Sequence, residues 1–242
     1  MPGFLLITKP PGPTSFDVVA KIRRLTGEKR VGHAGTLDPF ASGLLIVAVG
    51  RDYTKQLSDF VGLDKEYEAE ICLGATSTTG DPEGIIIKTN SMIVTPAPEP
   101  GSMDERGSRV KPGMTTQEIE KVLRSFIGPQ LQTPPMYSAK KVAGQKLYSL
   151  ARKGVVIERK PVSITIHAIE LLNYSWPLLT IKARVSSGTY LRTLGEDIGR
   201  ALGTGAYLTK LRRTSIGPYR IEQALNFSEL GQNPPNFKSL SE

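Results

Sequence analysis

Residues 65–73 alternate between apolar and acidic side chains, and this pattern limits the possible folds more than any other stretch. The apolar positions are Tyr67, Ala69, Ile71 and Leu73, and the acidic positions between them are Glu66, Glu68 and Glu70. Successive side chains of a strand point to opposite faces, so the pattern predicts a strand with one buried and one solvated face. Such strands are typical of antiparallel sheets.

Two later segments repeat this period of two. Their apolar positions are Val162, Ile164 and Ile166, and then Leu179, Ile181, Ala183 and Val185. Helical spacing predicts a helix after the capping box Thr115-x-x-Glu118, another over 188–203, and an early one capped by Ser15. Because strands and helices mix without regular alternation, we expect an α+β fold with a mixed, mainly antiparallel sheet and flanking helices.

The positive net charge of the chain favours a polyanionic partner. The 242 residues include 31 Lys and Arg against 23 Asp and Glu, a formal charge of +8. Nucleic acid is the first partner to consider, although a mildly basic protein without such a partner fits the charge equally well. With one cysteine, Cys72, an internal disulfide is impossible. We expect a cytoplasmic protein, because no signal peptide or membrane-length apolar segment is recognisable.

The two histidines, His33 and His167, form no ligand cluster, so we expect neither a metal nor a cofactor. Residues 98–114 are rich in Pro and Gly and predict a flexible insertion, and residues 231–242 predict a disordered tail. Residues 140–160 are strongly basic, which fits a solvated face or a segment that follows RNA phosphates. The near absence of acids favours the second interpretation.

The loop over 32–43 holds the residues most suited to chemistry, His33 and Asp38. Taken alone, an Asp before Pro is a turn signal, and its side chain would cap its own loop. His33 alone would be an ordinary hydrogen-bonded loop residue. On local sequence these structural roles are favoured.

Five sequence blocks favour functional roles for His33 and Asp38 over purely structural ones. Along the chain they are KPPGPTS at 9–15, HAGTLDP at 33–39, KEY at 65–67, GTYLRTL at 188–194 and LRRT at 211–214. They resemble the bacterial tRNA pseudouridine synthases of the TruB type over roughly residues 3–225. Residues 134–141, PPMYSAKK, also resemble the family's connecting segment.

The resemblance implies conversion of the uridine at position 55 of the tRNA T-loop into pseudouridine, without cofactor or metal. The base would flip out, its glycosidic bond would break, the uracil would rotate, and a C–C bond would form. Asp38 would be the nucleophile or the base. Direct attack on C1′ and proton abstraction from C2′ both stay open.

The resemblance also implies roles for other residues. Arg192 would keep Asp38 ionised, although a helical surface pair with Glu196 is an alternative. Tyr67 would stack on the flipped base, or be only a core aromatic. The remaining substrate-binding positions are His33 near the flipped base, Tyr190 and Leu211 in the uracil pocket, and Lys9, which would support the site or be a solvated turn lysine. The expected phosphate contacts are Lys140, Lys141, Lys146, Arg152, Lys153, Arg212 and Arg213.

We therefore expect a pseudouridine synthase fold with one catalytic domain over 1–230, a basic RNA-gripping insertion over 140–160, and no separate C-terminal RNA-binding domain. The partner would be the T-arm stem-loop of tRNA, and the protein a monomer without a membrane or an obligate protein partner. A T-arm-binding tRNA folding chaperone is the rival function, and uridines of other RNAs stay possible substrates. The set of Asp38, Tyr67 and Arg192 favours the enzyme, because a pure RNA binder would not need it.

Overall fold

The structure is a computed structural model and describes residues 2–89, 114–138, 141–142, 145–146, 151, 154–155 and 157–231. The chain divides into two compact units, each described by itself below. Unit 1 comprises Met1–Tyr67 and Leu211–Glu242, and unit 2 comprises Glu68–Lys210. Of the predicted disordered tail over 231–242, residues 232–242 lie outside the described residues. Of the predicted insertion over 98–114, only Met114 is described.

Unit 1 is built on two long antiparallel strands, β1 (Gly3–Lys9) and β3 (Ser42–Val49), which pair from Gly3↔Val49 to Lys9↔Gly43. Three short strands complete its edges: β2 (Val31–Ala34) antiparallel to β3, β14 (Leu225–Asn226) parallel to β1, and β13 (Tyr219–Arg220) antiparallel to β12. The end of β12 (Ala206–Ile216) lies parallel to β3 through Arg212↔Ser42.

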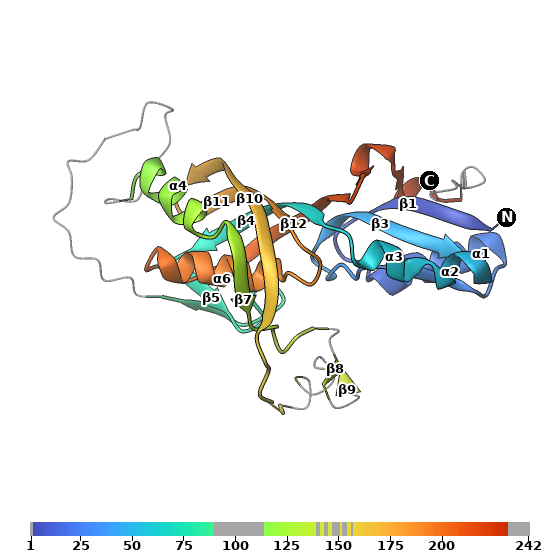
Figure 1. Ribbon diagram of the computed structural model, residues 1–242, viewed down its shortest axis with the longest axis horizontal. Coiled ribbons are helices and arrows are strands. Elements are labelled where there is room, and N and C mark those ends of the chain that lie inside the picture. Colours follow the sequence, from blue (N-terminus) through green and yellow to red (C-terminus); the bar gives the residue numbers. More distant parts are fainter. Residues whose placement is uncertain are drawn as a thin grey trace. The chain divides into compact units, whose positions relative to one another are not determined.

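Both faces of β1 are covered, which explains its continuous apolar sequence. Leu5 and Ile7 pack with Val18, Val19 and Ile22 of α1 (Ser15–Thr26). The alternate residues of β1, Phe4 and Leu6, pack with Phe60 of α3 (Leu57–Val61) and with Ile221 of η1 (Ile221–Gln223). The short helices α2 (Arg51–Lys55) and η2 (Phe227–Glu229) complete the unit, and Figure 1 shows α1, α2 and α3 beside β1 and β3.

The predicted helix cap at Ser15 is wrong. Thr14 is the N-cap of α1: its Oγ1 accepts the amide hydrogen of Asp17 (3.1 Å), and its own amide donates to Asp17 Oδ2 (2.8 Å). Ser15 is the first residue of the helix and is buried. Its hydroxyl is therefore not used for capping.

Unit 2 contains the strand order β12-β4-β11-β10-β7. Its strands are β4 (Lys65–Leu73), which begins in unit 1, β7 (Gly128–Gln132), β10 (Val162–Ser175) and β11 (Leu178–Val185). β10 is antiparallel both to β11 and to β7. Along β4, buried and half-buried residues alternate from Lys65 to Leu73, which confirms the predicted two-faced strand.

Two helices cover this sheet, α4 (Thr116–Ser125) and α6 (Leu191–Ala201) (Figure 1). The capping box of Thr115 and Glu118 begins α4 as predicted. Two hairpins complete the unit: β5 (Ala75–Ser77) with β6 (Ile86–Lys88), and β8 (Lys141–Val142) with β9 (Gln145–Lys146). The expected α+β fold with a mixed, mainly antiparallel sheet is confirmed.

Candidate active site

The loop that carries Asp38 joins β2 to β3 in unit 1 and is held on both sides of the aspartate. Before it, the Leu37 amide donates to Ser15 Oγ (2.9 Å), and the same hydroxyl donates to the Leu37 carbonyl (3.1 Å). After it, the Pro39 carbonyl accepts hydrogen bonds from Lys9 Nζ (3.2 Å) and from the Gly12 amide (2.8 Å). Asp38 itself is half-buried.

Lys9 is fully buried, at 0% exposed, so the alternative of a solvated turn lysine is wrong. Besides Pro39, its ammonium donates to the carbonyls of Pro10 (2.9 Å) and Pro13 (2.7 Å). A buried ammonium needs such acceptors. Lys9 thus ties the proline-rich turn after β1 to the loop just beyond Asp38.

Arg213 joins the two ends of the same loop. It is 1% exposed, its Nε donates to the Leu44 carbonyl (2.8 Å), and its Nη2 donates to the Gly35 carbonyl (2.9 Å). A guanidinium buried in this way supports the loop, and we assign it that role in place of the predicted phosphate contact. Its neighbour Arg212 is exposed on the other face of β12.

A second buried cation, Lys65, lies beside the beginning of the loop. Its Nζ donates to the carbonyls of Val61 (2.7 Å) and Leu63, and the side chain is mostly buried. Burial, followed by the positive charge of Arg213, lowers the Lys65 pKa from 10.5 to about 8, while Asp64 opposes the shift. Lys65 therefore loses its proton more readily than an exposed lysine does.

The other predicted residues of unit 1 are His33, Tyr67 and Leu211. The His33 ring meets Phe16 edge-on, with centroids 5.3 Å apart, and its buried Nδ1 has no hydrogen-bond partner. Burial, followed by the charge of Arg213, lowers the His33 pKa, which favours the neutral imidazole. Tyr67 and Leu211 are each 8% exposed. The burial of Tyr67 fits a core aromatic, and its stacking role stays a prediction.

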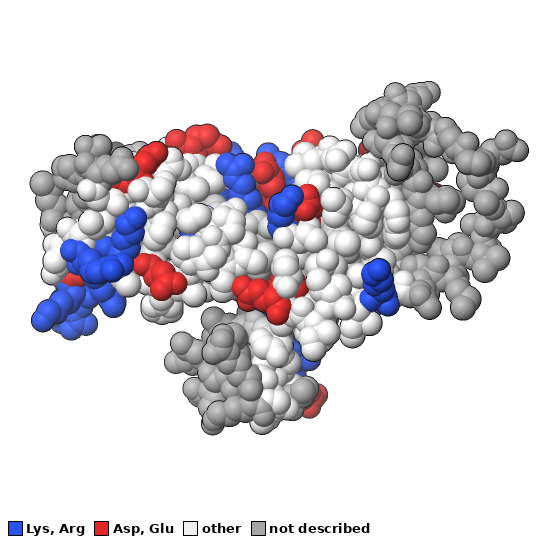
Figure 2. All heavy atoms as spheres, turned by 180° about the vertical axis from the view of Figure 1, so that it is seen from behind, with Lys and Arg blue, Asp and Glu red and all other residues white. Residues whose placement is uncertain are grey.

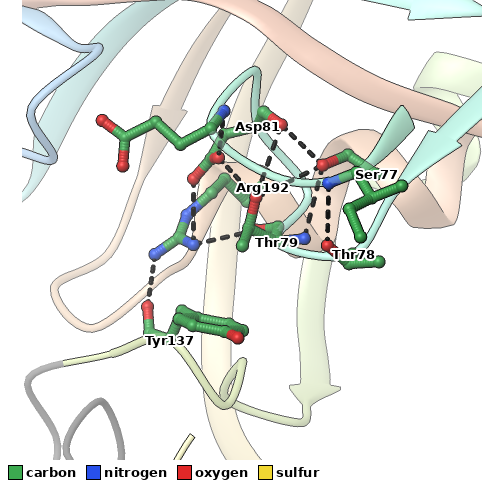
Figure 3. Close-up of polar contacts among 8 residues, drawn as sticks. Ser77, Thr78, Thr79, Asp81, Tyr137 and Arg192 are labelled. Atoms are coloured by element: carbon green, nitrogen blue, oxygen red, sulfur yellow. Dashed lines mark hydrogen bonds and ion pairs between the residues drawn. The ribbon is translucent and has the colours of Figure 1, made fainter. Parts of the chain in front are cut away.

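Arg192 lies in unit 2, in the first turn of α6, and forms a buried polar cluster (Figure 3). Its Nη1 is 3.2 Å from Asp81 Oδ2, and the two side chains are 5% and 4% exposed. The same Nη1 donates to the Thr79 carbonyl (2.9 Å), and Nη2 donates to the Tyr137 carbonyl (2.6 Å). A side chain buried this deeply does not fit the alternative of a surface pair with Glu196.

Asp81 is the buried partner of Arg192 that the sequence did not reveal. Its Oδ1 accepts hydrogen bonds from Thr79 Oγ1 (2.5 Å) and from the Glu83 amide (3.0 Å), which fixes the carboxylate facing Arg192. The preceding Gly80 has φ +74°, and a Cβ there would lie 3.2 Å from the Cβ of Arg192. The sequence signal for it was the hydroxyl-rich run 76–79, which Gly80 and Asp81 follow directly.

Tyr190 precedes α6 in unit 2 and is held by Gln132 of β7. The Tyr190 amide donates to Gln132 Oε1 (2.8 Å), and Gln132 Nε2 donates to the Tyr190 carbonyl (3.1 Å). One buried amide side chain thus satisfies both main-chain groups of the residue at the N-terminus of α6.

Basic residues expected to contact phosphates are only partly described. Lys140, Arg152 and Lys153 lie outside the described residues, while the main chains of Lys141 and Lys146 are register partners in the β8–β9 pair. Another basic surface lies at the end of unit 1 that carries α1 (Figure 2). The basic residues of α1 and of the turn after it are Lys21, Arg23, Arg24, Lys29 and Arg30.

The described residues contain no group of three His, Cys, Asp or Glu side chains that could hold a metal ion. Within the same part of the chain, no helix is both long and apolar enough to cross a membrane.

The fold is that of the pseudouridine synthases. Among solved structures, a chain of a Cbf5-Nop10-Gar1 complex superposes with a TM-score of 0.68 at 28% identity, over 94% of this chain and 53% of that one. A chain of an H/ACA RNP bound to a substrate RNA containing 2′-deoxyuridine gives a TM-score of 0.64 at 26% identity, over 94% and 52%. This chain spans about half the length of those solved chains.

Sequence comparison identifies the family. Residues 23–191 match the model for the N-terminal domain of TruB family pseudouridylate synthases, and residues 192–234 match the C-terminal domain of tRNA pseudouridylate synthase B. A tRNA pseudouridine synthase B from Protochlamydia amoebophila is 42% identical over 94% of this chain and 79% of its own length. One from Desulfotalea psychrophila is 46% identical, over 92% and 85%. The chain therefore belongs to the TruB family of pseudouridylate synthases.

Proposed function

We propose that this protein isomerises uridine to pseudouridine in tRNA, at position 55 of the T-loop. The observation that carries the proposal is the aspartate loop, whose peptides on both sides of Asp38 are fixed by buried polar groups. Such rigidity suits a carboxylate that must meet one ribose atom. The family, whose relatives are named tRNA pseudouridine synthase B, supplies the substrate class.

The reaction is an isomerisation and needs no external reactant. The N1–C1′ bond breaks, the uracil turns, C5 bonds to C1′, the hydrogen on C5 leaves as a proton, and N1 gains one. Asp38 either attacks C1′ or removes the C2′ proton, and both steps need an ionised carboxylate. Either step places the carboxylate next to the ribose of the flipped nucleotide.

Arg192 and Tyr67 complete the proposed machinery. Arg192 would hold Asp38 ionised, since a guanidinium stays charged and its planar fork can bind a carboxylate. Its buried contacts to Asp81, Thr79 and Tyr137 support this role, because they fix the guanidinium in one orientation. Tyr67 would stack on the flipped uracil, and its hydroxyl would help move the C5 proton.

RNA contacts are proposed for two groups of residues. His33, Tyr190 and Leu211 would contact the flipped base and its neighbours. Lys9 would support the aspartate loop through its hydrogen bond to the Pro39 carbonyl. Phosphate contacts would come from Arg212 and from the basic segment 140–160, with Lys140, Lys141, Lys146, Arg152 and Lys153. Affinity should then fall with added salt, and specificity should come from the shape of the T-loop and its splayed bases.

We also propose a monomer that works in the cytoplasm, with one catalytic domain over 1–230. The rival function, a tRNA folding chaperone, would need RNA binding alone. It would have no use for an aspartate whose neighbours Leu37 and Pro39 are both fixed by buried groups. The enzyme is therefore the better-supported function.

The test uses an unmodified T-arm hairpin RNA, incubated with the purified protein in the presence of EDTA. Pseudouridine is detected by carbodiimide labelling and primer extension, with a hairpin carrying cytidine at the target position as the control. We expect one new stop at the T-loop uridine and no stop in the control hairpin. Absence of the stop with the uridine hairpin would contradict the proposed activity.

A further inference from the structure

Ser15 is a buried hydroxyl that helix capping does not use. Thr14 caps α1, so the Ser15 side chain is free to bond elsewhere, and it is 1% exposed. Its Oγ lies within hydrogen-bond distance of both main-chain groups of Leu37, 22 residues further along the chain. Leu37 is itself 3% exposed, so no water is available to replace these bonds.

These two hydrogen bonds act directly on the peptide that carries Asp38. The Leu37 carbonyl is part of the Leu37–Asp38 peptide, and the Leu37 amide is part of the preceding one. Because peptide groups are planar, holding both groups fixes the planes on either side of Leu37. The orientation of the Asp38 main chain is then set on its N-terminal side by Ser15.

The C-terminal side of Asp38 is fixed by the same segment of the chain. Lys9 and Gly12 both donate to the Pro39 carbonyl. Ser15 therefore holds the residue before Asp38, and Lys9 and Gly12 hold the residue after it. Of the hydroxyls in residues 9–15, Thr14 bonds to Asp17 and only Ser15 bonds to the aspartate loop.

We propose that Ser15 is a positioning residue for Asp38: its hydroxyl holds both main-chain groups of Leu37 and so fixes the peptide from which the Asp38 carboxylate projects. The inference rests on the proposed function, because a fixed position matters only if Asp38 acts on the ribose. A displacement of about 1 Å at a reacting group can cost roughly 100-fold in rate.

The test compares Ser15→Ala with Thr14→Ala, which removes the neighbouring hydroxyl and the cap of the same helix. We expect Ser15→Ala to lower kcat on the T-arm hairpin by about 100-fold with hairpin Kd within threefold of wild type. Ser15→Thr, which keeps the hydroxyl, should recover most of the rate. Thr14→Ala should weaken the helix while keeping kcat within threefold of wild type.

A second measurement does not depend on activity. In wild-type protein the Leu37 amide should be protected from hydrogen exchange, and Ser15→Ala should speed its exchange by tenfold or more while Thr14→Ala leaves it unchanged. Unchanged exchange in Ser15→Ala, or unchanged kcat, would overturn the inference. If wild-type protein made no pseudouridine, the proposed function would fail, and the exchange result would still decide whether Ser15 holds the loop.

Discussion

Replacing Asp81 with Asn should destabilise unit 2, because it removes the buried carboxylate that lies against the Arg192 guanidinium. At 3.2 Å the pair attracts by about 5 kcal/mol with an effective dielectric of about 20, and burial of both charges offsets most of this. Breaking a buried ion pair by removing one partner typically costs about 3–5 kcal/mol. We expect roughly 3 kcal/mol for Asp81→Asn, since the amide keeps the shape of the carboxylate.

Arg192→Met should cost about 4 kcal/mol, because it also removes the donors to the Thr79 and Tyr137 carbonyls. The double variant should cost about 4–5 kcal/mol rather than about 7, which gives a coupling of about 2–3 kcal/mol. Urea unfolding monitored by fluorescence suits this cycle, since the only tryptophan, Trp176, lies in the same unit as the pair.

The matched control is the exposed pair of Arg200 and Asp197 on the same helix, 2.7 Å apart with side chains 76% and 31% exposed. Exposed pairs of this kind contribute about 0.3–0.5 kcal/mol. If the coupling of the buried pair were no larger than that of the exposed pair, Asp81 and Arg192 would not act as a unit and the reasoning would be refuted.

Two further predictions concern the support of the aspartate loop. Because burial lowers the Lys65 pKa from 10.5 to about 8, the unfolded chain holds this proton between those values and the folded one does not. The unfolding free energy of the wild type, relative to that of Lys65→Met, should therefore rise by on the order of 2 kcal/mol from pH 8 to 10.5, allowing for solvent screening. A difference between the two proteins that does not change with pH would contradict this. Gly43 has φ +113°, and a Cβ there would overlap the Arg213 carbonyl oxygen, so Gly43→Ala should cost roughly 3 kcal/mol or more in urea unfolding. Gly27→Ala, also at positive φ but with nothing within 4 Å, should cost only about 1 kcal/mol, and equal losses would argue against the close contact.

The regular elements could be predicted because their signals are local. The alternation of apolar and acidic residues along 65–73 predicted β4. The helical spacing of Leu191, Leu194 and Ile198 corresponds to the buried face of α6. The cap of the first helix was predicted one residue too late, at Ser15, and the structure has it at Thr14. Periodicity therefore located the elements better than it located their ends.

The polar groups around the site depend on contacts between distant parts of the chain. Thr14 and Ser15 are adjacent hydroxyls that can both cap a helix, and the choice between them depends on Leu37. Arg213 was predicted to contact phosphates, as was its neighbour Arg212, but it is 1% exposed. Its place two residues after Leu211, on the buried face of β12, was the signal that could have placed it inside.

The central claim is that Asp38 performs the chemistry, and single-turnover kinetics of Asp38→Asn tests it most directly. The assay measures pseudouridine formation on the T-arm hairpin alongside hairpin Kd, with Asp52→Asn as a control, since Asp52 is an exposed aspartate of unit 1. We expect Asp38→Asn to lose at least about 1,000-fold in rate with Kd within a few-fold of wild type, and Asp52→Asn to match wild type. A wild-type rate in Asp38→Asn would contradict the account.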